Sequence, residues 1–219
     1  YNFDEEYRPK LFKRKRDFVW EDPVHETVRL MPVIYDSDIV IEHMPQESHG
    51  KRDLACFYKH CRQGLRLSKR LHELYARELM LVGDEEDFRQ AREFFTASAG
   101  DAYRDGEELA QACCVVARAA RLAGDTVAFF KHTSKVIAEE ACSEICEMGH
   151  FYEEEGDWEE AAVWYYNAVY ETRPILSIQA GGREGLEGLI RCYEKMGCKE
   201  QVEIYKEELS SRDGDINKR

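Results

Sequence analysis

Residues 142–174, CSEICEMGHFYEEEGDWEEAAVWYYNAVYETRP, contain the pattern that decides the fold of this chain. Apolar residues recur every three or four positions on both sides of Gly156-Asp157, which predicts two helices joined by a turn. Gly156 favours the left-handed backbone that ends a helix, and Asp157 is a typical N-cap of the next one. The small residues Gly149 and Ala161 would face large side chains, so the helices can pack closely and antiparallel. The expected buried positions are Ile145, Met148, Gly149 and Tyr152, then Trp158, Ala161, Tyr165 and Ala168.

The same turn recurs along the chain, which indicates a repeated pair of helices. Gly-Asp occurs at 83-84, 124-125 and 156-157, and Gly197-Cys198 stands in the equivalent place near the end. The stretch 142–174 resembles a tetratricopeptide repeat (TPR), with the closing proline one place late at Pro174. The turns lie 41, 32 and 41 residues apart, against about 34 in that family. We therefore expect insertions at Thr96–Asp105 and Ile175–Glu184.

The fold implied by this resemblance is mainly α. We expect a TPR-like helical-hairpin solenoid over residues 51–212, with one or two helices over Arg52–Val82 and a flexible tail at 213–219. A short β-rich segment precedes the solenoid. Its residues, 1–50, hold four of the five prolines and no long helical period. Strands are predicted at Lys10–Lys15, Phe18–Glu21, Val24–Arg29 and Asp38–His43. Such a thin segment is expected to be the end of a larger α/β domain, of which the chain is a fragment.

Four short motifs in this segment carry a second resemblance. They are Arg8-Pro9-Lys10-Leu11-Phe12, Trp20, Val24-His25-Glu26 and Ile41-Glu42-His43. In this order they resemble the C-terminal part of the catalytic domain in bacterial family 2 glycosyltransferases, many of which continue into TPR-like repeats. The resemblance implies a sugar-transferring parent protein that uses a nucleotide sugar and a divalent metal, Mg or Mn.

Inverting sugar transfer needs a carboxylate base, for which Asp22 and Glu26 are the candidates. His25 could bind the metal-bound diphosphate or the acceptor, and the resemblance assigns Trp20 and Arg8 to the substrate. Salt bridges or strand-end packing are the alternative roles for Glu26 and His43. The Asp-x-Asp string at 36–38 stands in the wrong order for the donor metal site, and the one at 213–215 lies in a polar tail. We therefore expect no metal, no cofactor and no activity in this chain alone.

The first helices of the repeats are expected to form a partner groove. Fitting the register around Gly124, Gly156 and Gly197 places nine residues there: Gln111, Arg118, Arg121, Cys146, His150, Glu153, Glu187, Arg191 and Glu194. This mixed-charge surface lacks the clustered Lys, Arg and Asn that hold a peptide C-terminus. A protein or glycan acceptor is the expected partner, and homo-oligomers through the repeats are possible. The alternative is that this face packs on the catalytic domain or meets solvent.

Composition narrows the function classes. The net charge is −13, and residues 81–219 carry about −14 of it, which argues against nucleic acid as a partner. The locally basic run Lys13–Arg16 fits a solvated edge strand, with a phosphate or membrane patch or a nuclear signal as alternatives. No apolar run of about 18 residues or secretory signal is seen, so we expect a cytoplasmic protein whose eight cysteines are reduced. Cys142 and Cys146, one helical turn apart, favour buried thiols over a shared metal.

Two functions remain open. The first is the C-terminal portion of a glycosyltransferase whose repeats support catalysis or hold an acceptor. The second is a stand-alone TPR module for protein–protein interaction without enzymatic activity.

Overall fold

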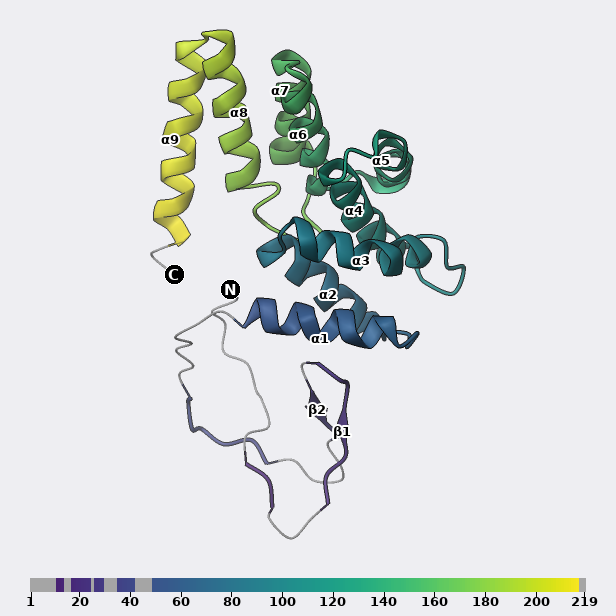
Figure 1. Ribbon diagram of the computed structural model, residues 1–219. Helices are drawn as coiled ribbons and strands as arrows, with labels where there is room; N and C mark the ends of the chain where they lie inside the picture. Colours follow the sequence, from purple (N-terminus) through teal and green to yellow (C-terminus); the bar gives the residue numbers. More distant parts are fainter. Residues whose placement is uncertain (1–10, 14–16, 25, 30–34, 42–48, 217–219) are drawn as a thin grey trace. The chain divides into compact units, whose positions relative to one another are not determined.

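The computed structural model describes residues 11–13, 17–24, 26–29, 35–41 and 49–216 (Figure 1). The chain divides into two compact units, residues 1–66 and 67–219, which we describe separately. We expected the division at residue 51. The observed one assigns the first long helix to the N-terminal unit.

The N-terminal unit contains a small antiparallel hairpin. Strand β1 (Trp20–Glu21) pairs with β2 (Thr27–Val28), with Trp20 opposite Val28. The ring of Trp20 lies 5.7 Å from that of Phe12, which in turn lies 5.1 Å from that of Phe18. The predicted strands at 18–21 and 24–29 are therefore present, but each is only two residues long.

The other two predicted strands are wrong where they can be compared. Residues 11–13 and 38–41 are not in strands, while Lys10, Arg14, Lys15, Glu42 and His43 lie outside the described residues. Ile39, Val40 and Ile41 are 61–77% exposed. An alternating pattern forms a strand only where a neighbouring strand accepts its hydrogen bonds and a core buries one face. The described residues offer the segment neither.

Residues 50–82 form two helices. Helix α1 (Gly50–Arg62) buries Leu54 and Phe57, and Gly64 interrupts the helical path with a φ of +72°. Helix α2 (Lys69–Val82) then begins the C-terminal unit, with the Ser68 hydroxyl accepting from the Leu71 amide at its start.

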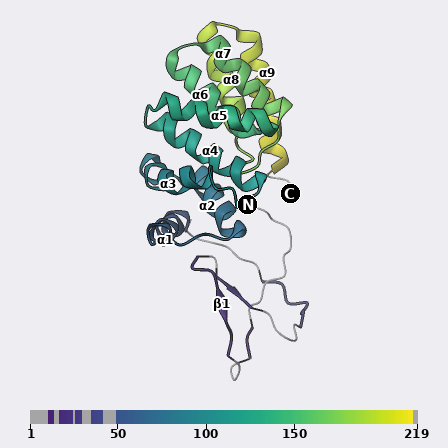
Figure 2. The same cartoon turned by 90° about the vertical axis from the view of Figure 1, so that its right-hand side faces the viewer.

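The C-terminal unit is a succession of packed helices (Figure 2). After α2 the described residues contain α3 (Glu85–Ser98), α4 (Gly106–Leu122), α5 (Thr126–Glu140), α6 (Cys146–Glu155), α7 (Trp158–Tyr166), α8 (Arg183–Met196) and α9 (Lys199–Ile216). A 3₁₀ turn (Ser143–Ile145) precedes α6, and a π-helical turn (Asn167–Glu171) follows α7. Helix α4 packs between α3 and α5; further along the chain α6 packs on α7, α7 on α8 and α8 on α9. In addition α2 contacts α4, α4 contacts α6, and α6 contacts α8, so these helices form one layer.

The recurring Gly-Asp turns behave largely as predicted. Gly124, Gly156 and Gly197 have φ values of +68°, +81° and +75°. The side chains of Asp84, Asp125 and Asp157 cap α3, α5 and α7 by accepting a backbone N–H. Gly83 differs, since its φ is −66°. Glycine is still required there, because a Cβ would lie 2.5 Å from the carbonyl oxygen of Leu79.

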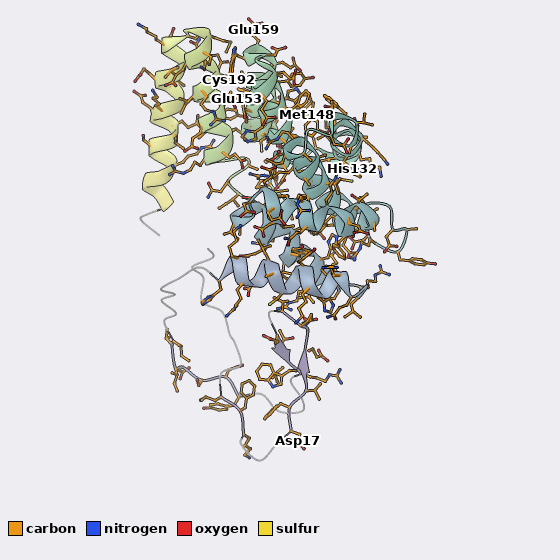
Figure 3. The ribbon with its side chains drawn as sticks, viewed as in Figure 1. Asp17, His132, Met148, Glu153, Glu159 and Cys192 are labelled. Carbon is orange, nitrogen blue, oxygen red and sulfur yellow. The ribbon has the colours of Figure 1, made fainter. Side chains whose placement is uncertain are left out.

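Tyr165 is the central core residue of the α6–α7–α8 region and is fully buried. Its ring lies against two glycines: a Cβ on Gly149 of α6 would be 2.8 Å from the ring, and one on Gly188 of α8 would be 2.6 Å away. The close helix packing expected from Gly149 is therefore confirmed. A neighbouring cluster joins Ala117 and Ala120 of α4, Phe129 of α5 and Met148 of α6, the last labelled in Figure 3.

Two sequence expectations need correction. Trp158 is half-buried at the start of α7, with the Lys195 ammonium 5.5 Å from its ring centre, and is not a core residue. The residues expected to form a tail from 213 instead continue α9 to Ile216. Contacts just before them hold this end of the helix: Arg212 pairs with Glu208 one turn earlier at 2.6 Å and donates to the carbonyl of Gly181 at 3.3 Å.

No helix among the described residues combines the length and the apolar character that crossing a membrane requires.

Candidate functional site

Polar side chains from α4, α6, α7 and α8 meet in one connected set, which we call the interhelix network. Its members are Arg118 and Arg121 of α4, Cys146, Glu147, His150, Glu153 and Glu154 of α6, Tyr165 of α7, and Glu184 and Arg191 of α8. Six of these ten were predicted for the partner groove: Arg118, Arg121, Cys146, His150, Glu153 and Arg191. Figure 3 labels Glu153, which lies on the side of α6 that meets α8.

Glu147 joins α4 to α6. It is almost fully buried, and Arg121 donates to one of its oxygens at 2.8 Å while Arg118 lies 3.4 Å from the other. Arg121 also pairs with Glu154. Burial is the largest influence on both guanidiniums and opposes their charge, but Glu147 acting with Glu184 on Arg118, and with Glu154 on Arg121, outweighs it and raises the pKa of both arginines. Both arginines therefore stay charged although they are partly buried.

Glu153 and Tyr165 join α6 and α7 to α8. Arg191 donates to both oxygens of Glu153, at 2.7 and 2.8 Å, in a bidentate pair. The Tyr165 hydroxyl donates to Glu153 at 2.7 Å and lies 2.8 Å from Nδ1 of His150. Burial favours the neutral form of Glu153, but hydrogen bonds from Arg191 and Tyr165 prevail and lower its pKa. Burial and the Glu153 charge raise the pKa of Tyr165 far above its usual range.

Glu184, in the first turn of α8, closes the network. One of its oxygens lies 3.0 Å from Nε2 of His150 and 3.6 Å from Arg118. Burial again opposes the charge, but His150 and Arg118 prevail, so the pKa of Glu184 is lowered. Sequence reasoning missed Glu184, which was placed in the insertion 175–184.

The two cysteines expected to share one face are separated. Cys142 lies in extended backbone before the 3₁₀ turn, and its sulfur is 3.6 Å from that of Cys114. Cys146 lies instead beside Glu147, His150 and Glu184. Burial, followed by the charges of Glu184 and Glu147, raises the pKa of the Cys146 thiol well above its ordinary value. Cys113, Cys114, Cys142, Cys146 and Cys192 are buried free thiols, as expected.

Glu144 is a buried carboxylate that the sequence did not reveal. It accepts from the backbone amides of Ile175, Leu176 and Ser177 at 3.2, 2.8 and 2.9 Å. It therefore holds the loop that follows the π turn. Within a helical pattern such a glutamate cannot be told from a surface residue, so no sequence signal pointed to it.

Three predicted groove residues do not belong to the network. Gln111 is buried and lies 3.4 Å from Nδ1 of His72 of α2. Glu187 pairs with Arg183 on its own helix at 3.3 Å. Glu194 pairs with Lys206 of α9 at 2.9 Å, on the exposed surface.

The candidate catalytic residues surround the β1–β2 hairpin. Trp20 is 59% exposed on β1, and Glu26 is exposed just before β2. Asp22 follows β1 with a φ of +72°, a left-handed conformation that Asp tolerates better than most residues. Arg8, His25 and His43 lie outside the described residues.

Two shallow surface depressions occur away from the network. One lies along α3 beside Arg89, Arg92 and Glu93, and the other lies at the α6–α7 turn beside Asp157 and Trp158. Comparison of the chain with protein-family models, curated proteins and solved structures found no match.

Proposed function

We propose that residues 67–216 form a TPR-like repeat module that holds a protein or glycan acceptor on the layer made by α2, α4, α6 and α8. The observation that carries the proposal is this layer, in which each helix contacts the next. Stacked repeats use such surfaces to bind extended partners. Arg118 of α4 and Arg191 of α8, whose side chains are 24% and 42% exposed, give the face cationic donors.

The module serves, in this proposal, a family 2 glycosyltransferase. The support is the order of the N-terminal motifs, Trp20, Val24-His25-Glu26 and Ile41-Glu42-His43, before the helices. The exposed ring of Trp20 suits stacking on a sugar. Glu26 or Asp22 would act as the base, with His25 and Arg8 toward the substrate. The nucleotide sugar and its Mg or Mn ion would be held by another part of the parent protein.

The first experiment is the intact mass of the protein in the cells that make it, detected with an antibody to this chain. A mass well above 25.6 kDa is expected, together with peptides that contain an Asp-x-Asp donor motif. The purified 219-residue chain should turn over no nucleotide sugar. Turnover by this chain alone would overturn the division of roles proposed above.

The acceptor role is tested on the full-length natural protein, expressed with single substitutions and assayed for its KM values for acceptor and nucleotide sugar. Arg191→Glu should raise the KM for the acceptor at least 10-fold while the KM for the nucleotide sugar is unchanged. Arg89→Glu is the matched control, because Arg89 is an exposed arginine on α3, paired with Glu86 at 2.6 Å and outside the layer. Equal effects of the two changes would refute an acceptor site on this face.

A stand-alone interaction module is the second candidate. It is favoured by the hairpin, since the part of residues 1–50 that the structure describes contains only two strands of two residues each, and Ile39, Val40 and Ile41 are exposed there. A catalytic domain needs a larger sheet. A natural mass near 25.6 kDa would select it.

A further inference from the structure

We propose that Cys146, Glu147, His150 and Glu184 bind a zinc-type divalent ion between α6 and α8. One ligand atom from each residue, four in all, lies within 4.8 Å of every other. Tetrahedral zinc bonds of about 2.0–2.3 Å place ligand atoms about 3.3–3.8 Å apart. The longest of these separations must therefore shorten by at most about 1.5 Å, which side-chain rotation can supply.

The spacing on α6 suits a metal. Cys146 and His150 are four residues apart and so share one helix face, and Glu147 lies one residue after the cysteine. Glu184 reaches the same point from the first turn of α8. Thiolate, imidazole and carboxylate together are the ligand classes of zinc, whereas Mg²⁺ and Ca²⁺ take oxygen alone.

The hydrogen bonds around His150 leave one position, between its Nε2 and Glu184, that a proton or a metal ion can fill. Tyr165 has one hydroxyl proton, and it goes to Glu153, because an ionised carboxylate can only accept. The tyrosine oxygen must then accept from Nδ1 of His150, which therefore carries a hydrogen. If Nε2 were bare, its lone pair would face an oxygen of Glu184 at 3.0 Å. Two acceptors repel each other at that distance, so a proton or a metal ion lies between them.

The same contacts prepare His150 as a ligand. A metal-binding histidine almost always donates its other ring N–H to a fixed acceptor, which orients the ring. Tyr165 fills that role, and Glu153 and Arg191 hold its hydroxyl in place. Since Tyr165 is fully buried between α6 and α8, the acceptor cannot drift.

The local charge also matches a divalent ion. Four carboxylates, Glu147, Glu153, Glu154 and Glu184, face three guanidiniums, Arg118, Arg121 and Arg191. The remaining charge is −1, and ionisation of Cys146 makes it −2. Metal binding forms bonds from the metal to Sγ of Cys146 and Nε2 of His150, and it releases two protons to solvent, one from the thiol and one that otherwise lies on Nε2. A zinc ion then leaves the network neutral.

Arg118 competes for two of the ligands, but weakly. It lies 3.4 Å from one oxygen of Glu147 and 3.6 Å from Glu184, longer than good ion-pair hydrogen bonds. Glu147 can turn that oxygen to a metal and keep Arg121 on the other at 2.8 Å.

A second cluster, Cys114, Cys142 and Glu144, is less suited to a metal. Three backbone amides already occupy both oxygens of Glu144, and the two sulfurs contact each other at 3.6 Å. It serves as an internal control.

The test is a titration of the reduced, chelator-treated chain with Zn²⁺ and, separately, with Co²⁺. We expect one tight equivalent of Zn²⁺ by calorimetry and, with Co²⁺, a thiolate-to-metal charge-transfer band with tetrahedral d–d absorption. Zn²⁺ at 100 times its Kd should raise the melting temperature by about 5–10 °C. Binding with no thiolate band, or no stoichiometric binding, would overturn the proposal.

Variants locate the site. Cys146→Ser should abolish the charge-transfer band. Glu184→Gln, which changes a part-exposed side chain and keeps its size, should weaken binding at least 10-fold. Tyr165→Phe should weaken it about 10–100-fold through loss of the ring acceptor. Cys142→Ser and the half-buried control Cys198→Ser should bind as the unchanged chain does. Retention of the band in Cys146→Ser, or its loss in Cys142→Ser, would assign the metal elsewhere, and circular dichroism confirms that each variant is folded.

Discussion

Replacement of Gly149 by alanine is expected to destabilise the chain by about 2 kcal/mol. The new Cβ would lie 2.8–2.9 Å from three ring carbons of Tyr165, where ordinary contact begins at 3.4 Å. The ring cannot retreat: Gly188 presses on its other side, and Glu153 and His150 hold its hydroxyl. Overpacking of this kind costs about 1–3 kcal/mol, here at the upper end because both sides are fixed. The better helix propensity of alanine returns about 1 kcal/mol.

Urea unfolding at neutral pH is the assay. The midpoint should fall while the slope stays constant, and the melting temperature should drop by about 4–8 °C. Gly106→Ala is the matched control, since a Cβ at that helical glycine meets no atom within 4 Å. It should be neutral or slightly stabilising. Stability of Gly149→Ala equal to or above that of the unchanged chain would refute the packing argument.

A double-mutant cycle isolates the contact. In a Tyr165→Leu background the ring is absent, so Gly149→Ala should cost nothing or be stabilising. A cost that persists at full size in that background would show that the strain lies in α6 itself and not against the tyrosine.

Three further predictions concern acid stability, one half-buried tryptophan and one thiol pair. Burial, and then the charge of Arg104, lowers the pKa of His72 to about 4 in the folded chain. In the unfolded chain the histidine binds a proton near pH 6.5, which favours unfolding as the pH falls. The free energy of unfolding should therefore decrease by up to about 3 kcal/mol between pH 6.5 and 4. His72→Gln should flatten this part of a denaturation-versus-pH profile, and an unchanged profile would show that other groups dominate. Trp158→Ala should cost about 1–2 kcal/mol in urea unfolding, below the 3–5 of a fully buried tryptophan, because the ring is half-buried. Diamide, a two-electron thiol oxidant, should form a disulfide between Cys114 and Cys142, whose sulfurs lie 3.6 Å apart. Peptide mass mapping should detect it as the loss of two hydrogens. The reaction should be slow at neutral pH, because contact with Cys142 and burial raise the pKa of Cys114.

The sequence predicts the helix pairs well, because their signals are local. Gly156 and Asp157 end and begin helices through their own backbone and side-chain chemistry, so neither depends on a distant partner. The register fitted from Gly156 placed His150 and Glu153 together on one face of the helix as groove residues, and in the structure both contact side chains of α8.

The failures have physical causes of three kinds. Cys142 does not share a face with Cys146, because residues 143–145 form a 3₁₀ turn and the four-residue spacing of an α-helix does not apply. Glu184 could not be placed, because the length of an irregular loop hides the register of the helix after it. The predicted strand is absent over residues 38–41, the part of it that the structure describes, because an alternating pattern forms a strand only where a neighbouring sheet pairs with it.

The hydrogen bonds that Ser143 and Glu144 make with residues 173–177 should make the α6–α7 hairpin resistant to stretching. The Ser143 amide donates to the carbonyl of Arg173 at 3.0 Å, and Glu144 receives the three amides that follow Pro174. The segment before α6 and the segment after the π turn are thus joined to each other by one group of hydrogen bonds. A force applied along the polypeptide would load these bonds together, in shear, before it reached either helix. Under a stretching force the hairpin should therefore unfold in one step, when these bonds break together. A pair of helices without such bonds would unfold gradually, one turn at a time.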